Sequence, residues 1–194
     1  MIKIQKAAEP AILIDNKQQW TNVLKQTIAD VGGYENLTQA DKAQHLYHYK
    51  HRDIHTALKN GAMAERCVYC ECDIRSGDPN VEHYHPKSLY VDETFEWNNL
   101  YSACVRCNRS KGSFDTVRLP FIHPMNEDPE EFLTYDMLTI VCRHTSGTNH
   151  LKAKNVIERC ELQRDEMIPA LSDRLLLFTQ YSQQLIPVIK KYNG

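Results

Sequence analysis

The sequence predicts an α+β fold in which a small central unit, stabilised by a bound metal ion, lies between two helical regions. Apolar residues recur at helical spacing near both ends of the chain. The middle, from Cys67 to about Phe121, instead mixes Gly, Asn, Pro and Cys with short strand-like pieces, and it holds two Cys-x-x-Cys pairs. A loop-rich segment of this kind needs a source of stability other than apolar bulk, and paired cysteines indicate a metal.

Composition limits the classes of protein that this chain can belong to. Its 194 residues carry 23 Lys and Arg against 25 Asp and Glu, a formal net charge of −2. That balance excludes a protein that coats nucleic acid by overall charge, although it allows a local basic patch. No apolar run is long enough for a transmembrane helix, and the first residues carry charge where a signal peptide needs an apolar stretch. We therefore expect a cytoplasmic protein with no membrane association, whose seven cysteines are metal ligands or core thiols.

The N-terminal region, residues 1–60, is predicted to be helical. After an extended lead-in, one helix follows Asn16 and stops at Gly32. Thr38 and Asp41 form a variant of the capping box, so a second helix is predicted from there to Gly61. One face of this second helix is polar: His45, His48, His51, Arg52, His55 and Lys59. Such a face is either solvated or contacts phosphate or a partner.

The C-terminal region, residues 124–194, is also predicted to be mainly helical. A short strand at 138–142 and a loop at 146–149 come first. Two helices then occupy residues 150–192, interrupted at Pro169 and ended near Pro187. Their predicted core contacts are Leu171, Leu175, Phe178, Leu185 and Ile186. Residues 61–123 form the remaining unit.

The two cysteine pairs predict a structural zinc site. Cys67 and Cys70 form the first pair, Cys104 and Cys107 the second, with 33 residues between them at 71–103. A Cys-x-x-Cys turn presents two thiolates on one side of a tight loop, and two such turns make a tetrahedral four-thiolate site. Cys72 is a competing ligand.

The other three cysteines do not require disulfides. Cys142 and Cys160 lie in apolar stretches and are predicted core thiols. A redox role for the paired cysteines is the alternative, but the βαβ context typical of a redox Cys-x-x-Cys is absent from the sequence.

Between the two cysteine pairs lies a group of residues suited to phosphodiester hydrolysis. Glu82 and His83 are adjacent, and carboxamides follow near the second pair. A neutral histidine can act as a general base near pH 7, and Glu and Asn oxygens suit a hard cation such as Mg²⁺ or Mn²⁺. In a regular strand His83 and His85 would share a face, so His85 is either a rival base or a structural hydrogen bonder.

The segments VEHYHPKS and WNNLYSACVRCNRSKG, at residues 81–88 and 97–112, resemble the HNH or ββα-metal endonuclease family. The resemblance covers about residues 67–113 and implies a ββα-metal core with structural zinc. It implies that His83 is the general base, that Glu82 and Asn108 hold a catalytic divalent cation, and that Asn99 steadies the loop that orients the base. His85 remains a candidate beside them.

Over a longer stretch the chain has a Met-Ile-Lys-Ile start, an EHYHPKS core, the WNNL and CNRSKG segments, and a predicted helical tail. In this combination it resembles the PtuB-type HNH nucleases of Septu and retron anti-phage systems. That resemblance implies a PtuA-type ATPase as partner, and in retron loci a reverse transcriptase with its RNA–DNA product.

Local charge agrees with a nucleic-acid substrate. The basic residues nearest the motif, predicted to contact nucleic acid, are Lys87, Arg106, Arg109 and Lys111. The sequence thus predicts a metal-dependent endonuclease. The alternative is a non-catalytic zinc-knuckle module that binds nucleic acid or protein, which would have no need of Glu82, His83 and Asn108.

Overall fold

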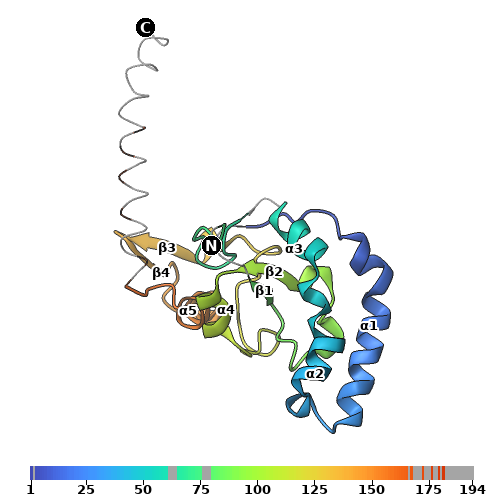
Figure 1. Cartoon of the computed structure of the whole chain (residues 1–194). Coiled ribbons are helices and arrows are strands. Elements are labelled where there is room, and N and C mark those ends of the chain that lie inside the picture. The colour runs from blue at the N-terminus through green and yellow to red at the C-terminus, as the bar shows by residue number, and fades with distance from the viewer. Residues whose placement is uncertain are drawn as a thin grey trace.

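The computed structural model describes residues 1, 3–60, 65–75 and 80–165, together with five isolated positions between 167 and 181. Within these limits it is a mixed α+β structure, as predicted, with helices on both sides of a small central sheet (Figure 1). Its main elements are α1 (Ala11–Asp30), α2 (Gln39–Asp41), α3 (Arg52–Lys59), β1 (Asn80–His83), β2 (Leu100–Ala103), α4 (Val105–Lys111), β3 (Leu133–Asp136), β4 (Thr139–Cys142) and α5 (Gly147–Arg159).

The proline interruptions and core contacts predicted beyond residue 165, at Pro169, Leu171, Leu175, Phe178, Leu185, Ile186 and Pro187, lie outside the described residues. Among the described helices, none combines the length and the apolar character that a bilayer-spanning segment requires.

The first helix is longer than the sequence pattern indicates. It begins at Ala11, because Pro10 lies at the N-cap with extended backbone angles and lacks the N–H that a helix start leaves unpaired. It ends before Gly32, whose φ of +75° suits glycine. The capping box at Thr38 is confirmed, because the Asp41 backbone N–H donates to Thr38 Oγ1 (3.1 Å) and the Thr38 N–H donates to the Asp41 carboxylate (2.9 Å).

The second predicted helix is broken into parts. A π-helical turn at Lys42–Leu46 and a 3₁₀ turn at Tyr47–Lys50 follow α2, and α3 starts only after His51. His51 is extended, and its Nδ1 accepts a hydrogen bond from the Asp53 backbone N–H (3.2 Å), so it caps α3. The predicted polar face is not continuous: His48 stacks on Trp20 at 4.6 Å between ring centroids, whereas Arg52, His55 and Lys59 line a groove.

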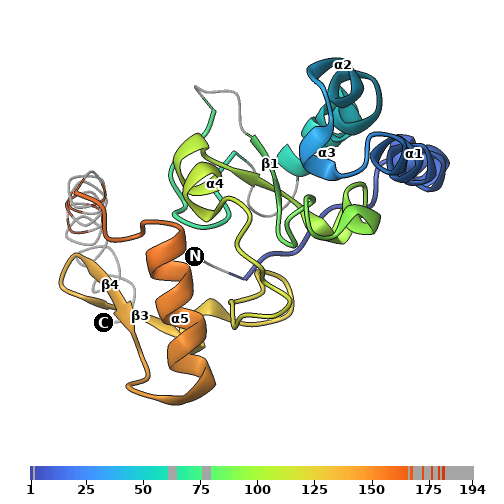
Figure 2. The same ribbon diagram turned by 90° about the horizontal axis from the view of Figure 1, so that it is seen from below.

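The central unit is an antiparallel pair, β1 with β2, followed by α4. The register places His83 opposite Leu100 and Val81 opposite Ser102. Side chains on the two faces of the pair enter two apolar cores. One core lies toward α1 and α3 and contains Leu13, Leu24, Leu46, Ile54, Val81, Phe95, Trp97 and Leu100. The other lies toward α5 and contains Cys67, Tyr69, Tyr101, Ala103, Phe121, Ile122, Val156 and Cys160. Figure 2 shows α1–α3 and α5 on opposite sides of this centre.

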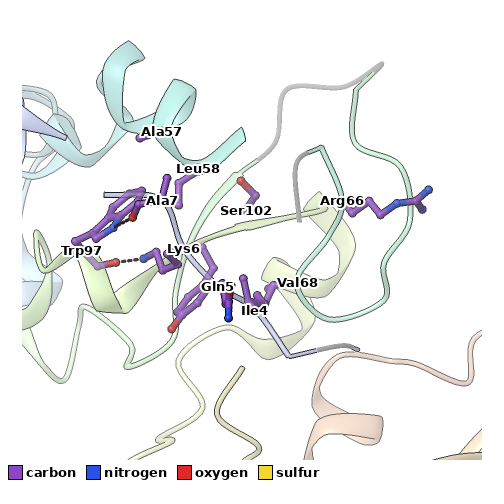
Figure 3. Close-up of a pocket in the computed structure, with 11 residues that line it drawn as sticks. Ile4, Gln5, Lys6, Ala7, Ala57, Leu58, Arg66, Val68, Trp97 and Ser102 are labelled. Atoms are coloured by element: carbon purple, nitrogen blue, oxygen red, sulfur yellow. Dashed lines mark hydrogen bonds between the residues drawn. The ribbon is translucent and has the colours of Figure 1, made fainter. Parts of the chain in front are cut away.

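Residues 3–9 cross the central unit and form hydrogen bonds with it. The Ile4 backbone N–H donates to the Pro124 carbonyl (2.8 Å). Lys6 Nζ lies over the Trp97 ring, 3.9 Å from its centroid, and donates to the Trp97 carbonyl oxygen (Figure 3). It also donates to the Leu100 carbonyl oxygen. Burial lowers the pKa of Lys6 to about 7, against the opposing pull of Glu9.

The C-terminal region contains one strand that the sequence pattern did not reveal. β4 lies within the predicted strand at 138–142, but it pairs with β3, and Met137 turns the chain between them with φ of +54°. α5 starts at Gly147, inside the predicted loop at 146–149, and packs Ala153, Val156 and Ile157 into the core.

Candidate active site and metal centre

Two tight turns bring the cysteines together. In the first, the Cys67 N–H donates to the Cys72 carbonyl (3.0 Å) and the Glu71 N–H donates to the Cys67 carbonyl (2.9 Å), with Glu71 in the left-handed region. In the second, Cys104 is the N-cap of α4, and its sulfur accepts a hydrogen bond from the Cys107 backbone N–H (3.4 Å). Backbone donors to sulfur stabilise the thiolate form that a metal requires.

The sulfur positions fit a zinc ion. The Sγ atoms of Cys67, Cys70, Cys72 and Cys104 all lie within 4.8 Å of one another. The Cys70 and Cys104 sulfurs are 3.8 Å apart. A tetrahedral site with Zn–S distances of about 2.3 Å has sulfur–sulfur edges of about 3.8 Å. The donor set and its spacing therefore suit structural zinc.

The structure brings five thiols, not four, to this centre. Cys67 interacts with the thiols of Cys70, Cys72, Cys104 and Cys107. Cys72 takes the fourth place in the tightest group, where the sequence spacing predicts Cys107. The Cys107 thiol lies beside that group and donates to the Cys160 carbonyl (3.4 Å). The choice between these two as the fourth ligand stays a prediction.

An arginine accompanies the cysteine centre. Arg164 directs Nη2 toward the Cys70 sulfur (3.3 Å) and Nη1 toward the Cys107 sulfur (3.7 Å). A zinc ion with four thiolates carries a net negative charge, so a guanidinium here would offset it. Cys160 is fully buried in the core, and Cys142 packs against that core, as predicted.

His83 lies at the end of β1 and is held in one tautomer. Its Nε2 lies 3.0 Å from the backbone carbonyl of Thr94. A carbonyl only accepts, so Nε2 carries the proton and Nδ1 of the neutral ring carries a lone pair. Nδ1 is buried and has no hydrogen-bond partner. An orphaned acceptor of this kind is rare in a protein interior and marks the place where a proton donor such as water would bind.

The surroundings of His83 keep its ring neutral. Burial, and then the nearby positive charge of Lys87, hold its pKa well below the ordinary value, against the hydrogen bond to Thr94. The ring of Tyr49 meets the imidazole edge-on, with 4.6 Å between centroids. His83 is only 4% exposed, so Tyr49 covers it in this conformation.

Asn99 ties together the loop that follows β1. Its Oδ1 accepts from the His85 backbone N–H (2.6 Å), and its Nδ2 donates to the carbonyls of His85 and Glu93 (3.0 Å each). His85 pairs through Nδ1 with the Glu93 carboxylate at 2.5 Å. Asn99 therefore holds the backbone on either side of the loop between His83 and Thr94.

Glu82 is buried and paired. It is 2% exposed, and its Oε1 lies 2.6 Å from Lys111 Nζ and accepts from the Tyr69 hydroxyl (3.1 Å). Burial raises the pKa of Glu82, against the attraction of Lys111. The role of Glu82 as a metal ligand stays a prediction, since Oε1 already has two partners.

The structure places the four basic residues that were predicted to contact nucleic acid in different surroundings. Lys111 is 2% exposed, and its Nζ also donates to the His83 carbonyl (2.8 Å), so in this structure it supports β1 and does not face solvent. Arg106 pairs with Glu161 (3.0 Å) on the side toward α5. Arg109 is exposed. Lys87 and Asn108 line one groove.

That groove contains residues that the motif did not indicate. Opposite Lys87 and Asn108 it is lined by Tyr49, Lys50 and residues of α3. The only sequence signal for these was the polar stripe over residues 45–59. The Thr94 carbonyl had no signal at all, because a backbone group is the same in every residue.

Comparison with known proteins agrees with this geometry. Residues 67–114 match the HNH endonuclease family. Over 70 residues the chain is 40% identical to "Septu protein PtuB" of Bacillus thuringiensis, covering 35% of this chain and 27% of that protein. Over 173 residues it is 27% identical to "Septu protein PtuB" of Bacillus mycoides (strain KBAB4), covering 70% of this chain and 55% of the relative. The chain thus spans from about a quarter to about half of the curated relatives it matches.

Proposed function

We propose that this chain, in which residues 67–114 form an HNH endonuclease domain, is a metal-dependent endonuclease that hydrolyses phosphodiester bonds in nucleic acid. The observation that supports this most directly is the state of His83: Nε2 faces a carbonyl, and the buried Nδ1 has no partner. A histidine with that tautomer and a lowered pKa is a general base already in its active protonation state at neutral pH.

In the proposed reaction His83 Nδ1 takes a proton from water as the water oxygen attacks phosphorus. The bond from phosphorus to the 3′ oxygen breaks, and that oxygen leaves as a hydroxyl after gaining a proton from solvent. The products are a 5′ phosphate and a 3′ hydroxyl. Thr94 stabilises the imidazolium that forms, because its carbonyl accepts from the Nε2–H throughout.

The residues present fit a hard divalent cation. Asn108 lines the groove and would offer an amide oxygen, whereas the buried Glu82 carboxylate would have to exchange Lys111 for the cation. Mg²⁺ is commonly held by one or two protein oxygens together with waters and substrate phosphate, so no larger acidic cluster is required. When bound, Mg²⁺ or Mn²⁺ would neutralise charge on the phosphate and the leaving oxygen. Structural zinc at the cysteines would hold β2, α4 and the first turn in place for this site.

Lys87 would act on the phosphate. It lines the groove, lies 5.5 Å from the Tyr49 ring centroid and is close enough to His83 to influence its pKa. For water and phosphate to reach Nδ1, the Tyr49 ring must move, since His83 is almost fully covered. The proposal therefore includes a displacement of the Tyr47–Lys50 turn when substrate binds.

The wider setting is proposed from the Septu relatives. We infer a cytoplasmic effector of anti-phage defence that works with a PtuA-type ATPase, and in a retron locus with a reverse transcriptase and its RNA–DNA product. The test is cleavage of DNA and RNA panels by the wild type and by His83→Ala, with and without that ATPase. Metal-dependent cleavage lost in His83→Ala supports the proposal. Binding that survives without cleavage in any metal would favour a non-catalytic zinc-knuckle module.

A further inference from the structure

We propose that α3 and the turn before it form a phosphate-binding wall, so that the groove between α3 and the HNH domain holds the backbone of the nucleic acid being cut. The inference rests on the proposed function for its choice of ligand. It extends the substrate site to residues 50–59, outside the segment that matches the HNH endonuclease family.

The groove is large and cationic. It encloses about 530 Å³ between two walls. Lys50, Arg52 and Lys59 lie on one wall, and Lys87 and Asn108 lie on the other. Among the described residues that line it, four are Lys or Arg and none is Asp or Glu. The chain as a whole carries a charge of −2, so this concentration of positive charge is local.

The cations of the α3 wall can reach a ligand. The Arg52 side chain is 92% exposed, and its carboxylate neighbour Asp53 is at 3.9 Å, a surface contact that holds it weakly. Lys50 is exposed, and its Nζ rests over the Tyr47 ring at 3.8 Å from the centroid. Lys59 is half-buried at the end of α3. A polyanion could engage all three without breaking a buried interaction.

The two walls also influence each other electrostatically. Burial lowers the pKa of Lys87; the nearby Glu82 carboxylate opposes this, and the positive charges of Lys111 and Lys50 add to the lowering. An anion bound between cations that repel each other relieves that repulsion. Lys50 and Lys87 line the same groove, so one bound phosphate backbone could be near both.

The groove leads to the proposed reaction centre. Tyr49 lines it, and the same ring covers His83. Asn108, the proposed cation ligand, lies on the opposite wall. A strand whose phosphates follow Arg52 and Lys50 would pass over Tyr49 toward Lys87. The neighbourhood of phosphodiester-cleaving residues favours nucleic acid over an acidic peptide as the occupant.

The recognition would be of phosphate, with little reading of sequence. Tyr49 and His55 are the only side chains with aromatic rings among the described lining residues, so the groove lacks the row of stacking rings that reads unpaired bases. Lysine and arginine contacts to phosphate position a strand without distinguishing its bases.

The experiment measures binding separately from cleavage. Fluorescence anisotropy of labelled 20-nucleotide single-stranded DNA, duplex DNA and RNA is recorded with the full chain and no added divalent metal. The groove variant is Arg52→Gln with Lys59→Gln. The control is Lys25→Gln with Lys154→Gln, which removes the same charge at two exposed positions outside the groove. Thermal melting confirms that both variants fold.

We expect the groove variant to bind at least about tenfold more weakly than wild type, and the control to stay within about twofold. The slope of log K against log salt should fall in magnitude by about 1.4 to 1.8, since each phosphate contact contributes about 0.7 to 0.9. Arg52→Lys, which keeps the charge, should retain most of the affinity. The preferred substrate among the three probes then identifies the nucleic acid.

The failures of the two proposals can be told apart. If the groove variant binds every probe as the control does, the inference is overturned, even if the wild type cleaves. If the wild type cleaves nothing in any metal but the groove variant loses binding, the groove stands and the nuclease proposal falls. Displacement of the probes by polyglutamate at equal charge concentration would overturn the choice of nucleic acid.

Discussion

Replacing Lys111 by methionine tests the account of the site's interior. Methionine keeps most of the length and the apolar stem of lysine but removes the charge. In the structure Lys111 Nζ neutralises the Glu82 carboxylate at 2.6 Å and donates to the His83 carbonyl at 2.8 Å. The variant therefore leaves the Glu82 carboxylate buried without its counter-charge, in the residue that precedes the proposed base on β1.

The size of the effect follows from burial. The side chains of Lys111 and Glu82 are 0% and 3% exposed. Removing one partner of a buried ion pair costs about 3–5 kcal/mol. For a chain of this size each kcal/mol lowers the melting temperature by about 2–4 °C, so the expected drop is about 6–20 °C. The double variant Lys111→Met, Glu82→Gln should melt well above the single variant, because it buries no charge.

The loss of stability in Lys111→Met should depend on pH, in a direction set by the raised pKa of Glu82. Burial raises the pKa of Glu82, and loss of Lys111 would raise it further. A carboxyl with a raised folded-state pKa stabilises the fold when protonated, and that contribution is lost as pH rises through the folded pKa. The deficit of Lys111→Met relative to wild type should thus be larger at pH 8 than at pH 6. The assay is thermal unfolding by circular dichroism at the two pH values, above the range where acid would release zinc.

A melting temperature of Lys111→Met within about 2 °C of wild type at pH 8 would contradict this prediction. A deficit that grows as the pH is lowered from 8 to 6 would also contradict it. Either result would mean that Glu82 is neutral or solvated and that Lys111 is available for another role, such as contact with phosphate.

Three further predictions concern the zinc centre, the N-terminal segment and the loop after β1. Cys72→Ser and Cys107→Ser are compared by elemental analysis of bound zinc. Only the variant that removes the fourth ligand should bind less zinc. Equal zinc retention in both variants would show that the two thiols substitute for each other. Lys6→Met should gain stability relative to wild type as pH falls from 8.5 to 6, because burial lowers the pKa of Lys6 to about 7 and the protonated lysine destabilises the fold. Urea unfolding at the two pH values measures the difference in the free energy of unfolding, and a difference that stays constant would contradict the prediction. Asn99→Ala should lower the free energy of unfolding by about 1–3 kcal/mol for each backbone group left unpaired. It should also abolish cleavage. An active variant would show that other contacts hold the loop.

Short-range patterns in the sequence predicted those features that depend on short-range geometry. The capping box at Thr38 and the two cysteine turns at Cys67 and Cys104 each involve residues within a few positions of one another, so spacing alone predicts these turns. The order of elements in the central unit followed from the family resemblance. Strand β4 was found by its apolar run, whereas its partner β3 is half exposed and shows little alternation.

Features that depend on how distant segments meet could not be predicted. Lys111 resembles a solvent-facing helix residue until β1 places Glu82 against it. Cys72 enters the thiol group because the first turn curls back through Glu71. The break at His51, which directs Arg52 and Lys59 into the groove, depends on backbone angles that the helical periodicity of residues 39–60 does not reveal.

The central claim is that His83 is the base of a metal-dependent phosphodiesterase. The most direct measurement is cleavage of end-labelled DNA and RNA by wild type and His83→Ala in Mg²⁺ or Mn²⁺, with the PtuA-type ATPase present and absent and the product ends identified. The account predicts 5′-phosphate products from the wild type, no cleavage in chelator, and a loss of at least about a hundredfold in His83→Ala, the typical contribution of a general base. Cleavage by His83→Ala at the wild-type rate, or cleavage by wild type that needs no divalent metal, would contradict it.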